Sequence, residues 1–435
     1  MKKMKAQKRN LWFVGVSIVL AVLVGSFLHD SSFLYKNAIT GVFKVGGELF
    51  LNALTLIVAP LVASSIISGM VRAGSEKNFS TLGAKTFGFY IGTSLAAVLI
   101  GVFLANIFQP GASQSLENFQ NLQHSSLDSL APFQNDSEFW HNISKIFTNL
   151  VPSNIIDAFG KNDMLGIIFF SIIFGFAISQ IPEKKAEIVG NFFKGIFHTM
   201  LKFTQIIMKT LPIGVFFLVA GEFAKTGFGA LKPVAYFVLV VLLALFLYAC
   251  VLLPLLLKFI GKVNPFWHVK AMFPAIMTAF STSSSSATIP ITMECVEKRA
   301  KVSNHITSLV VPLGSSINMA GSALYESVAA LFIAQVYGLE ITIVQQILVI
   351  VLALLTSIGI AGVPSASLVV IIIVLKTIGL PTEAVGLVVA VDRLLDMCRT
   401  VVNIFSDSCC AVLVARTEGE ENVLQTDPSE IKDAI

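Results

Sequence analysis

The sequence predicts an all-α polytopic membrane protein, and three observations support this fold class. Of the 435 residues, 55% are hydrophobic and only 13% are charged, and the mean hydropathy is +0.81. Apolar runs long enough for a membrane helix, which needs about 20 residues, recur from residue 11 almost to residue 415. Two of the later runs are broken in their middles by small and polar residues. Little of the chain is left for a soluble domain.

Six uninterrupted apolar runs come first, and they predict crossings near residues 11 to 28, 42 to 72, 82 to 109, 163 to 181, 193 to 222 and 230 to 258. The first run follows five Lys or Arg residues and resembles a signal peptide. Its length and the lack of an A-x-A-like cleavage site favour a retained helix.

The positions of the basic residues and of the cysteines agree with a membrane protein. Basic residues gather at the start, at 72–85, at 184–185, at 258–270 and at 298–301. The positive-inside rule makes these stretches cytoplasmic, so both termini are expected in the cytoplasm of a multi-pass cell (inner) membrane protein. The same flanking residues explain the net charge of +4, so no nucleic-acid partner is expected. The five cysteines show neither metal-ligand spacing nor a disulfide framework.

The two interrupted segments are the most informative feature of the chain. They run from Ser281 to Pro290 and from Ser357 to Ser367, and a polar-studded helix follows each. Irregular backbone at membrane depth is tolerated only where protein or a wet cavity satisfies its amides and carbonyls. Both segments therefore predict re-entrant helical hairpins. Two such breaks in matching positions indicate an inverted-repeat transporter site.

The last apolar helix carries a polar stripe. With Asp392 at 0° and about 100° per residue, Asp396, Arg399, Thr400, Asn403 and Asp407 all fall within one arc of about 100°. Each Asp or Arg at the bilayer centre costs about 2.5–3.5 kcal/mol on insertion scales, so the stripe must face a polar interior. Buried structural ion pairs would explain the charges but would leave Thr400 and Asn403 without a role.

This stripe has the chemistry of a substrate and cation site. A carboxylate such as Asp396 suits an amino group, and a guanidinium such as Arg399 suits a second carboxylate. Asp407 and Asn403, one turn apart, offer hard oxygen ligands of the kind Na⁺ needs. Helix N-termini at the two breaks, near Ser284 and Ser285 in the first, would favour an anionic group.

Between the two breaks lies a further polar segment, from Pro312 to Glu326. Two glycines around Asn318 predict a local unwinding of this helix. Glu326 is the only acid between Glu297 and Glu340. An acid so deep is a functional-site hypothesis, most simply a proton carrier, with a hydrogen-bonded structural glutamate as the alternative.

The motifs S-S-S-S-A-T, N-M-A-G-S, G-I-A-G-V-P and D-R-L-L-D-M-C-R-T-V-V-N, in this order, resemble the dicarboxylate/amino acid:cation symporter family of glutamate and aspartate transporters. The resemblance covers nearly the whole chain and implies eight transmembrane helices plus two re-entrant hairpins arranged as inverted repeats. It also implies a homotrimer in membrane lipid, with a scaffold of early helices and a mobile transport domain that moves like an elevator. On this pattern the chain divides into scaffold helices 1–2 (1–81), helix 3 with an extracellular loop (82–144), scaffold helices 4–5 (145–229), helix 6 (230–264), hairpin 1 (265–302), helix 7 (303–340), hairpin 2 (341–379), helix 8 (380–416) and a cytoplasmic tail (417–435).

The resemblance also implies roles for individual residues in binding an acidic amino acid. Asp396 would bind the amino group and Arg399 the side-chain carboxylate. The main carboxylate would bind Asn403 and the backbones of Ser285 and Val363. Ser284, Ser322 and Thr400 would complete the pocket.

Coupling to Na⁺ and/or H⁺, with no organic cofactor, follows from the same resemblance. One sodium site would use Asn403, Asp407 and the carbonyls of Gly314 and Asn318. A second would use carbonyls around Ser316 and at Ser357, Ile358 and Ile360, and a third would use Tyr90, Thr93, Ser94 and Asn318. The third site normally needs an aspartate where this chain has Ala320. Glu326 matches the proton-carrying glutamate of H⁺-coupled relatives, and Ser367 stands where a glycine is common.

Other functions remain as alternatives. A C4-dicarboxylate would not use the amino-binding Asp396, and a neutral amino acid would leave the charge of Arg399 uncompensated. An ion channel would not concentrate its substrate. An enzyme is not expected, because an intramembrane serine protease built on the serine run and His305 would have no nucleophile elbow and no use for the polar stripe.

Overall fold

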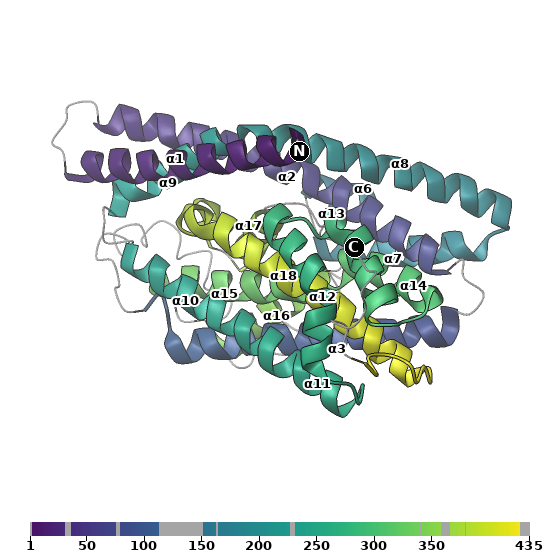
Figure 1. Ribbon diagram of the computed structural model, residues 1–435. Coiled ribbons are helices and arrows are strands. Elements are labelled where there is room, and N and C mark those ends of the chain that lie inside the picture. The colour runs from purple at the N-terminus through teal and green to yellow at the C-terminus, as the bar shows by residue number, and fades with distance from the viewer. Residues whose placement is uncertain are drawn as a thin grey trace.

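The computed structural model describes residues 2–30, 36–74, 79–112, 151–161, 164–226, 231–339, 341–357, 366–378 and 380–426, and these residues form helices without a single strand among them (Figure 1). The earlier helices are α1 (Lys2–Asp30), α2 (Lys36–Gly74), α3 (Phe79–Phe108), α6 (Ile155–Lys161), α7 (Met164–Gln180), α8 (Glu183–Ile207), α9 (Leu211–Thr226), α10 (Leu231–Leu247) and α11 (Leu253–Phe259). The later ones are α12 (Pro265–Thr282), α13 (Ser285–Glu294), α14 (Asn304–Ile317), α15 (Ala320–Val336), α16 (Ile343–Ser357), α17 (Ala366–Thr377) and α18 (Gly386–Thr417).

The helices pack in two groups. In the first group, α1 packs against α9, and α2 packs against α7, α8 and α9. In the second group, α18 contacts α3, α10, α12, α13, α14 and α15. Figure 1 shows α1, α2 and α8 along one edge of the molecule, with the yellow α18 running through the other helices. The two groups meet where α9 contacts α18 and where α2 contacts α14 and α17.

The first predicted interruption is present between α12 and α13. Ser283 has a left-handed backbone with φ 49°, and Ser284 is extended. The Ser284 hydroxyl caps α13 by accepting a hydrogen bond from the Ala287 N–H at 3.3 Å. The π-helical turn Cys295–Arg299, at the far end of α13, contacts α12 again. The chain therefore doubles back at the serine run.

The second interruption falls between α16 and α17, which contact each other. The residues that join them, Ile358, Ile360 and Val363 among them, lie outside the described residues. The unwinding expected around Asn318 is present, because α14 ends at Ile317 and α15 begins at Ala320.

Two of the predicted apolar runs are irregular, and proline explains both irregularities. The run near 193–222 forms α8 and α9, joined by the 3-10 turn Met208–Thr210 just before Pro212. The run near 230–258 widens into a π-helical turn at Tyr248–Leu252, just before Pro254. Proline lacks the N–H that would bond to the preceding turn, so the regular helix is interrupted there.

Residues 418–426, which follow α18, fold back on the end of the second group. Lys85 at the start of α3 donates to Glu418 at 2.6 Å, and the Leu424 N–H donates to the Ala300 carbonyl at 3.1 Å. Arg416 donates to the Gly261 carbonyl at 2.9 Å. The beginning of the predicted tail is thus ordered against the same helix ends that carry the basic stretches.

Four of the described helical segments are long and apolar enough to cross a membrane: 82–108, 232–259, 304–336 and 386–417. Shorter apolar helices occur at 16–29, 59–71, 166–180, 211–221, 343–357 and 367–377. This pattern fits a polytopic membrane protein. The count of eight spans stays a prediction.

Gly25 allows the close packing of α1 on α9. A Cβ at this position would lie 2.7 Å from the Ala220 carbonyl oxygen and 2.8 Å from the Phe223 Cβ. We expect Gly25→Ala to destabilise the protein by about 1–3 kcal/mol, as overpacking does, and to lower its thermal midpoint in detergent. Gly41→Ala is the matched control, because nothing lies within 4 Å of a Cβ there. Equal midpoints for the two variants would contradict the packing of α1 on α9.

Candidate functional site

The polar stripe of α18 faces the interior of the second group, as its spacing predicts. None of its residues is more than 7% exposed, and these residues are Asp392, Asp396, Arg399, Thr400, Asn403 and Asp407. The surrounding helices α3, α14 and α15 all contact α18. The stripe therefore lines an internal site and does not face lipid.

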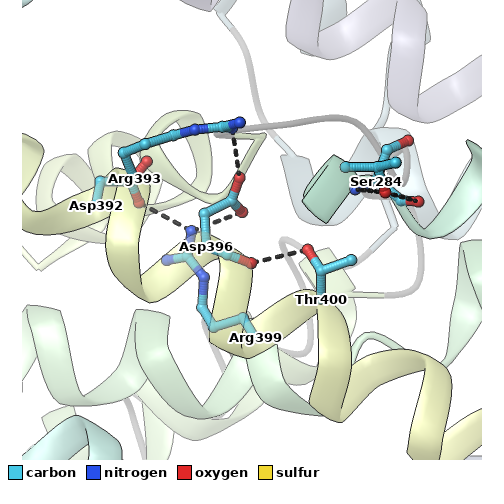
Figure 2. A network of polar contacts seen from close by, with 7 residues as sticks. Ser284, Asp392, Arg393, Asp396, Arg399 and Thr400 are labelled. Carbon is cyan, nitrogen blue, oxygen red and sulfur yellow. Dashed lines mark hydrogen bonds and ion pairs between the residues drawn. The ribbon is translucent and has the colours of Figure 1, made fainter. Parts of the chain in front are cut away.

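Arg399 lies at one end of this site and is completely buried. Its Nη2 donates to Asp392 Oδ1 and to Asp396 Oδ1, each at 2.9 Å. Its guanidinium carbon lies 3.8 Å from the ring centroid of Tyr325, in a cation–π contact. Figure 2 shows Asp392 and Asp396 converging on this guanidinium. Two carboxylates and one aromatic ring thus hold the cation in place.

Arg393 contributes a second guanidinium to the same cluster. Its Nη1 lies 3.7 Å from Asp396 Oδ2, and its side chain is 18% exposed. Figure 2 shows Arg393 reaching Asp396 from the side opposite Arg399. The sequence prediction gave no site role to Arg393, Asp392 or Tyr325. The position of Asp392 on the polar arc was the available signal for it.

Asn403 connects the stripe to the start of α15. Its Oδ1 accepts a hydrogen bond from the Gly321 N–H at 2.8 Å. Its Nδ2 donates to Ser322 Oγ at 3.1 Å and lies 3.3 Å from Met319 Sδ. Asn403 and Ser322, both predicted for the substrate pocket, therefore touch at the break between α14 and α15.

Asp407 lies beside the end of α14. Its Oδ1 accepts a hydrogen bond from Asn318 Nδ2 at 2.9 Å, and Asn318 Oδ1 accepts one from Ser94 at 3.1 Å. A Cβ on Gly314 would lie only 2.5 Å from Asp407 Oδ1. The absence of a side chain at Gly314 lets the carboxylate approach the carbonyl end of α14, where helix carbonyls and the negative end of the dipole favour a cation.

The predicted ligands on α3 lie in this same region. The Tyr90 hydroxyl donates to the Val310 carbonyl at 2.5 Å, and Thr93 donates to the Phe89 carbonyl at 2.7 Å. Ser94 reaches Asn318, as described above. Ser94 thus contacts Asn318 directly, Tyr90 lies near Gly314, and Thr93 lies near Cys410 of α18. The third predicted sodium site stays a prediction.

The remaining predicted residues occupy the surroundings of the cluster. Ser284 and Ser285 lie at the break before α13, which contacts α18, and Figure 2 draws Ser284 beside the cluster. Thr400 donates its hydroxyl proton to the Asp396 carbonyl at 2.8 Å, so it can only accept from a ligand. Ser316 lies in the last turn of α14 and Ser357 ends α16. Val363, Ile358 and Ile360 lie outside the described residues.

Glu326 is fully buried in α15, one residue after Tyr325. Neither of its carboxylate oxygens has a hydrogen-bond partner within the described part of the chain. Ser367 of α17 lies close enough to Glu326 for a side-chain hydrogen bond, and Arg399 of α18 is near enough to interact with it electrostatically. A carboxylate buried here would be costly as an anion without further partners. The proton-carrier role of Glu326 and its structural alternative both stay predictions.

Comparison with known proteins gives one family for almost the whole chain. The family model of the "Sodium:dicarboxylate symporter family" matches residues 11–417. The proton/glutamate-aspartate symporter of Escherichia coli (strain K12) is 36% identical over 94% of this chain and 92% of its own length. The proton/sodium-glutamate symport protein of Bacillus subtilis (strain 168) is 35% identical over 97% and 95%, and excitatory amino acid transporter 3 of Mus musculus is 32% identical over 95% and 87%.

These matches cover the full set of motifs and the site around α18. The family consists of transporters, and its members support a symporter and not a channel. The chain belongs to the sodium:dicarboxylate symporter family.

Proposed function

We propose that this symporter carries acidic amino acids, L-glutamate or L-aspartate, in symport with Na⁺ and/or H⁺. The observation that carries the proposal is the buried cluster of Asp396 and Arg399 beside Asn403. A substrate with one amino group and two carboxylates matches an acid, a guanidinium and an amide in one pocket. Relatives at 32–36% identity are named as glutamate or glutamate-aspartate symporters and as excitatory amino acid transporters, and these names support the same substrates.

Within this proposal, Asp396 binds the substrate's ammonium group and Arg399 its side-chain carboxylate. Arg399 has the capacity, because its Nε and Nη1 have no partner among the described residues while Nη2 holds the two aspartates. Asn403 and the amides at the two interrupted segments, with Ser285 and Val363, bind the main carboxylate. Ser284, Ser322 and Thr400 complete the pocket.

The cation that accompanies the substrate binds at Asp407. Its proposed oxygen ligands are the side chains of Asp407 and Asn403 and the backbone carbonyls of Gly314 and Asn318, and the position of Gly314 beside Asp407 Oδ1 supports this set. Na⁺ is a hard cation and prefers such oxygens. The carbonyls of Ser316, Ser357, Ile358 and Ile360 are proposed for a second ion.

Transport itself is proposed to follow an elevator path in a homotrimer embedded in lipid. The second helix group would carry substrate and ions past the first, along the contacts of α9 with α18 and of α2 with α14 and α17. The basic stretches at 258–270 and 298–301 lie at the end where Arg416 and Leu424 fold back. By the positive-inside rule this end is cytoplasmic in the cell membrane.

The role of Arg399 can be tested by a substitution that keeps its charge. We expect Arg399→Lys to raise the KM for glutamate at least about tenfold, because lysine cannot form the planar, forked contact of a guanidinium with a carboxylate. Uptake of labelled glutamate, aspartate, serine and succinate into proteoliposomes measures this. Lys298→Ala, which removes an exposed ion pair with Glu294, is the control. An unchanged glutamate KM in Arg399→Lys would refute the assignment, and preferred uptake of succinate would favour a C4-dicarboxylate substrate.

If Asp407 binds the coupling cation, a methyl group added at Gly314 should weaken the binding of Na⁺. In Gly314→Ala the new methyl group would meet Asp407 Oδ1 at 2.5 Å, so we expect the Na⁺ concentration for half-maximal glutamate uptake to rise. Gly92→Ala, with nothing within 4 Å of its Cβ, is the matched control on α3. If both variants keep the sodium dependence of the wild type, Asp407 does not bind the coupling cation.

Proton coupling is expected to depend on Glu326. An imposed inward H⁺ gradient should drive glutamate uptake in the wild type, and Glu326→Gln should lose this drive, because an amide cannot carry the proton. The measurement is labelled uptake with and without the pH gradient at constant Na⁺. Equal stimulation of wild type and variant would show that Glu326 is not the carrier.

A further inference from the structure

We propose that Arg393 takes the place of the substrate's ammonium group in the empty site. Arg393 pairs with Asp396 when no substrate is bound, and the ammonium group displaces it when substrate binds. The inference rests on the proposed role of Asp396 in binding that ammonium group. It assigns a positioning function to a residue that lies outside the predicted pocket.

The geometry places Asp396 between two guanidinium groups that differ in how firmly they are held (Figure 2). Arg399 is completely buried, donates to a second carboxylate at 2.9 Å and lies against the Tyr325 ring. It cannot leave Asp396 without losing all of these contacts. Arg399 is therefore the permanent partner of Asp396.

Arg393 is held much more weakly. Its Nη1 lies 3.7 Å from Asp396 Oδ2, beyond normal hydrogen-bond length, and its side chain is 18% exposed. A long, partly exposed arginine has other rotamers open to it. Asp396 Oδ2 is thus the oxygen that a substrate ammonium group can take over, and Arg393 is the cation it displaces.

The net charge of the cluster explains why Arg393 would replace the ammonium group at Asp396. Asp392, Asp396 and Arg399 together carry one net negative charge, and Arg393 brings the total of the cluster to zero. An ammonium group at Asp396 supplies the same positive charge. The Asp396 carboxylate is therefore paired with a second cation both with substrate, by the ligand's ammonium group, and without it, by Arg393.

A symporter must return its empty site across the membrane before each new cycle. An uncompensated negative charge buried in the moving helices would raise the barrier to that step, since buried unpaired charge is strongly unfavourable. Arg393 would lower this barrier without touching the loaded form. Its loss should therefore slow net uptake, which requires the empty return, and spare substrate exchange, which does not.

The test compares two assays on the same proteoliposomes. Net uptake of labelled glutamate is measured into empty vesicles, and exchange is measured into vesicles filled with unlabelled glutamate. We expect Arg393→Ala to reduce net uptake about tenfold or more while exchange stays within about twofold of the wild type, a tenfold change in rate corresponding to about 1.4 kcal/mol in a barrier. Arg393→Lys, which keeps the charge, should restore most of the net uptake. Lys298→Ala, at the exposed pair with Glu294, should change neither assay.

The outcomes separate this inference from the proposed function. An equal loss of net uptake and exchange in Arg393→Ala would overturn the inference, because it would make Arg393 a binding or folding residue. No change in either assay, or a failure of Arg393→Lys to rescue, would also overturn it. If the wild type exchanges no acidic amino acid, the proposed function itself fails, whatever the variants do.

Discussion

Charge compensation inside the membrane is the constraint on which the rest of the structure depends. The α18 stripe contains several charged residues of which none is more than 7% exposed, and each would be costly at membrane depth without a partner. Arg399 forms ion pairs with Asp392 and Asp396, and the side chain of Asn318 donates a hydrogen bond to Asp407. The neighbouring helices are consequently arranged around α18 so that these partners reach it.

The break between α14 and α15 follows from the same constraint. A continuous helix would bond all its own amides and carbonyls and would present none of them to α18. Because α14 ends at Ile317 and α15 starts at Ala320, the backbone N–H of Gly321 is free to donate to Asn403. The side-chain amide of Asn318, which lies in the break, donates to Asp407. The break in the helix thus lets a backbone group and a side chain of this segment form hydrogen bonds with the polar stripe of α18.

Much of this arrangement could be predicted because it depends on local periodicity. The 100° spacing placed the α18 stripe on one face, the serine run marked the break before α13, and two glycines marked the unwinding at Asn318. What local spacing could not supply was long-range pairing. Even within α18, Arg399 lies three residues from Asp396 and seven from Asp392, so helical spacing allowed an ion pair with either. The structure shows that Arg399 pairs with both. The contact of Tyr325 with Arg399 and the return of Leu424 to Ala300 depend on how separate helices meet, which no pattern within one helix encodes.

The same reasoning bears on Ala320, where the resemblance leads one to expect an aspartate. Ala320 is fully buried, and the nearby hydroxyl groups are satisfied internally: Tyr90 donates to Val310, and Ser94 donates to Asn318. Asp407 then supplies the one carboxylate that these side chains gather around. One cation beside Asp407 would balance the charge of its carboxylate. A second cation at the same place would be buried without an anion, which is strongly unfavourable. Ala320 therefore weakens the prediction of a third sodium site at Tyr90, Thr93, Ser94 and Asn318, and leaves these groups joined to their neighbours by the hydrogen bonds described above.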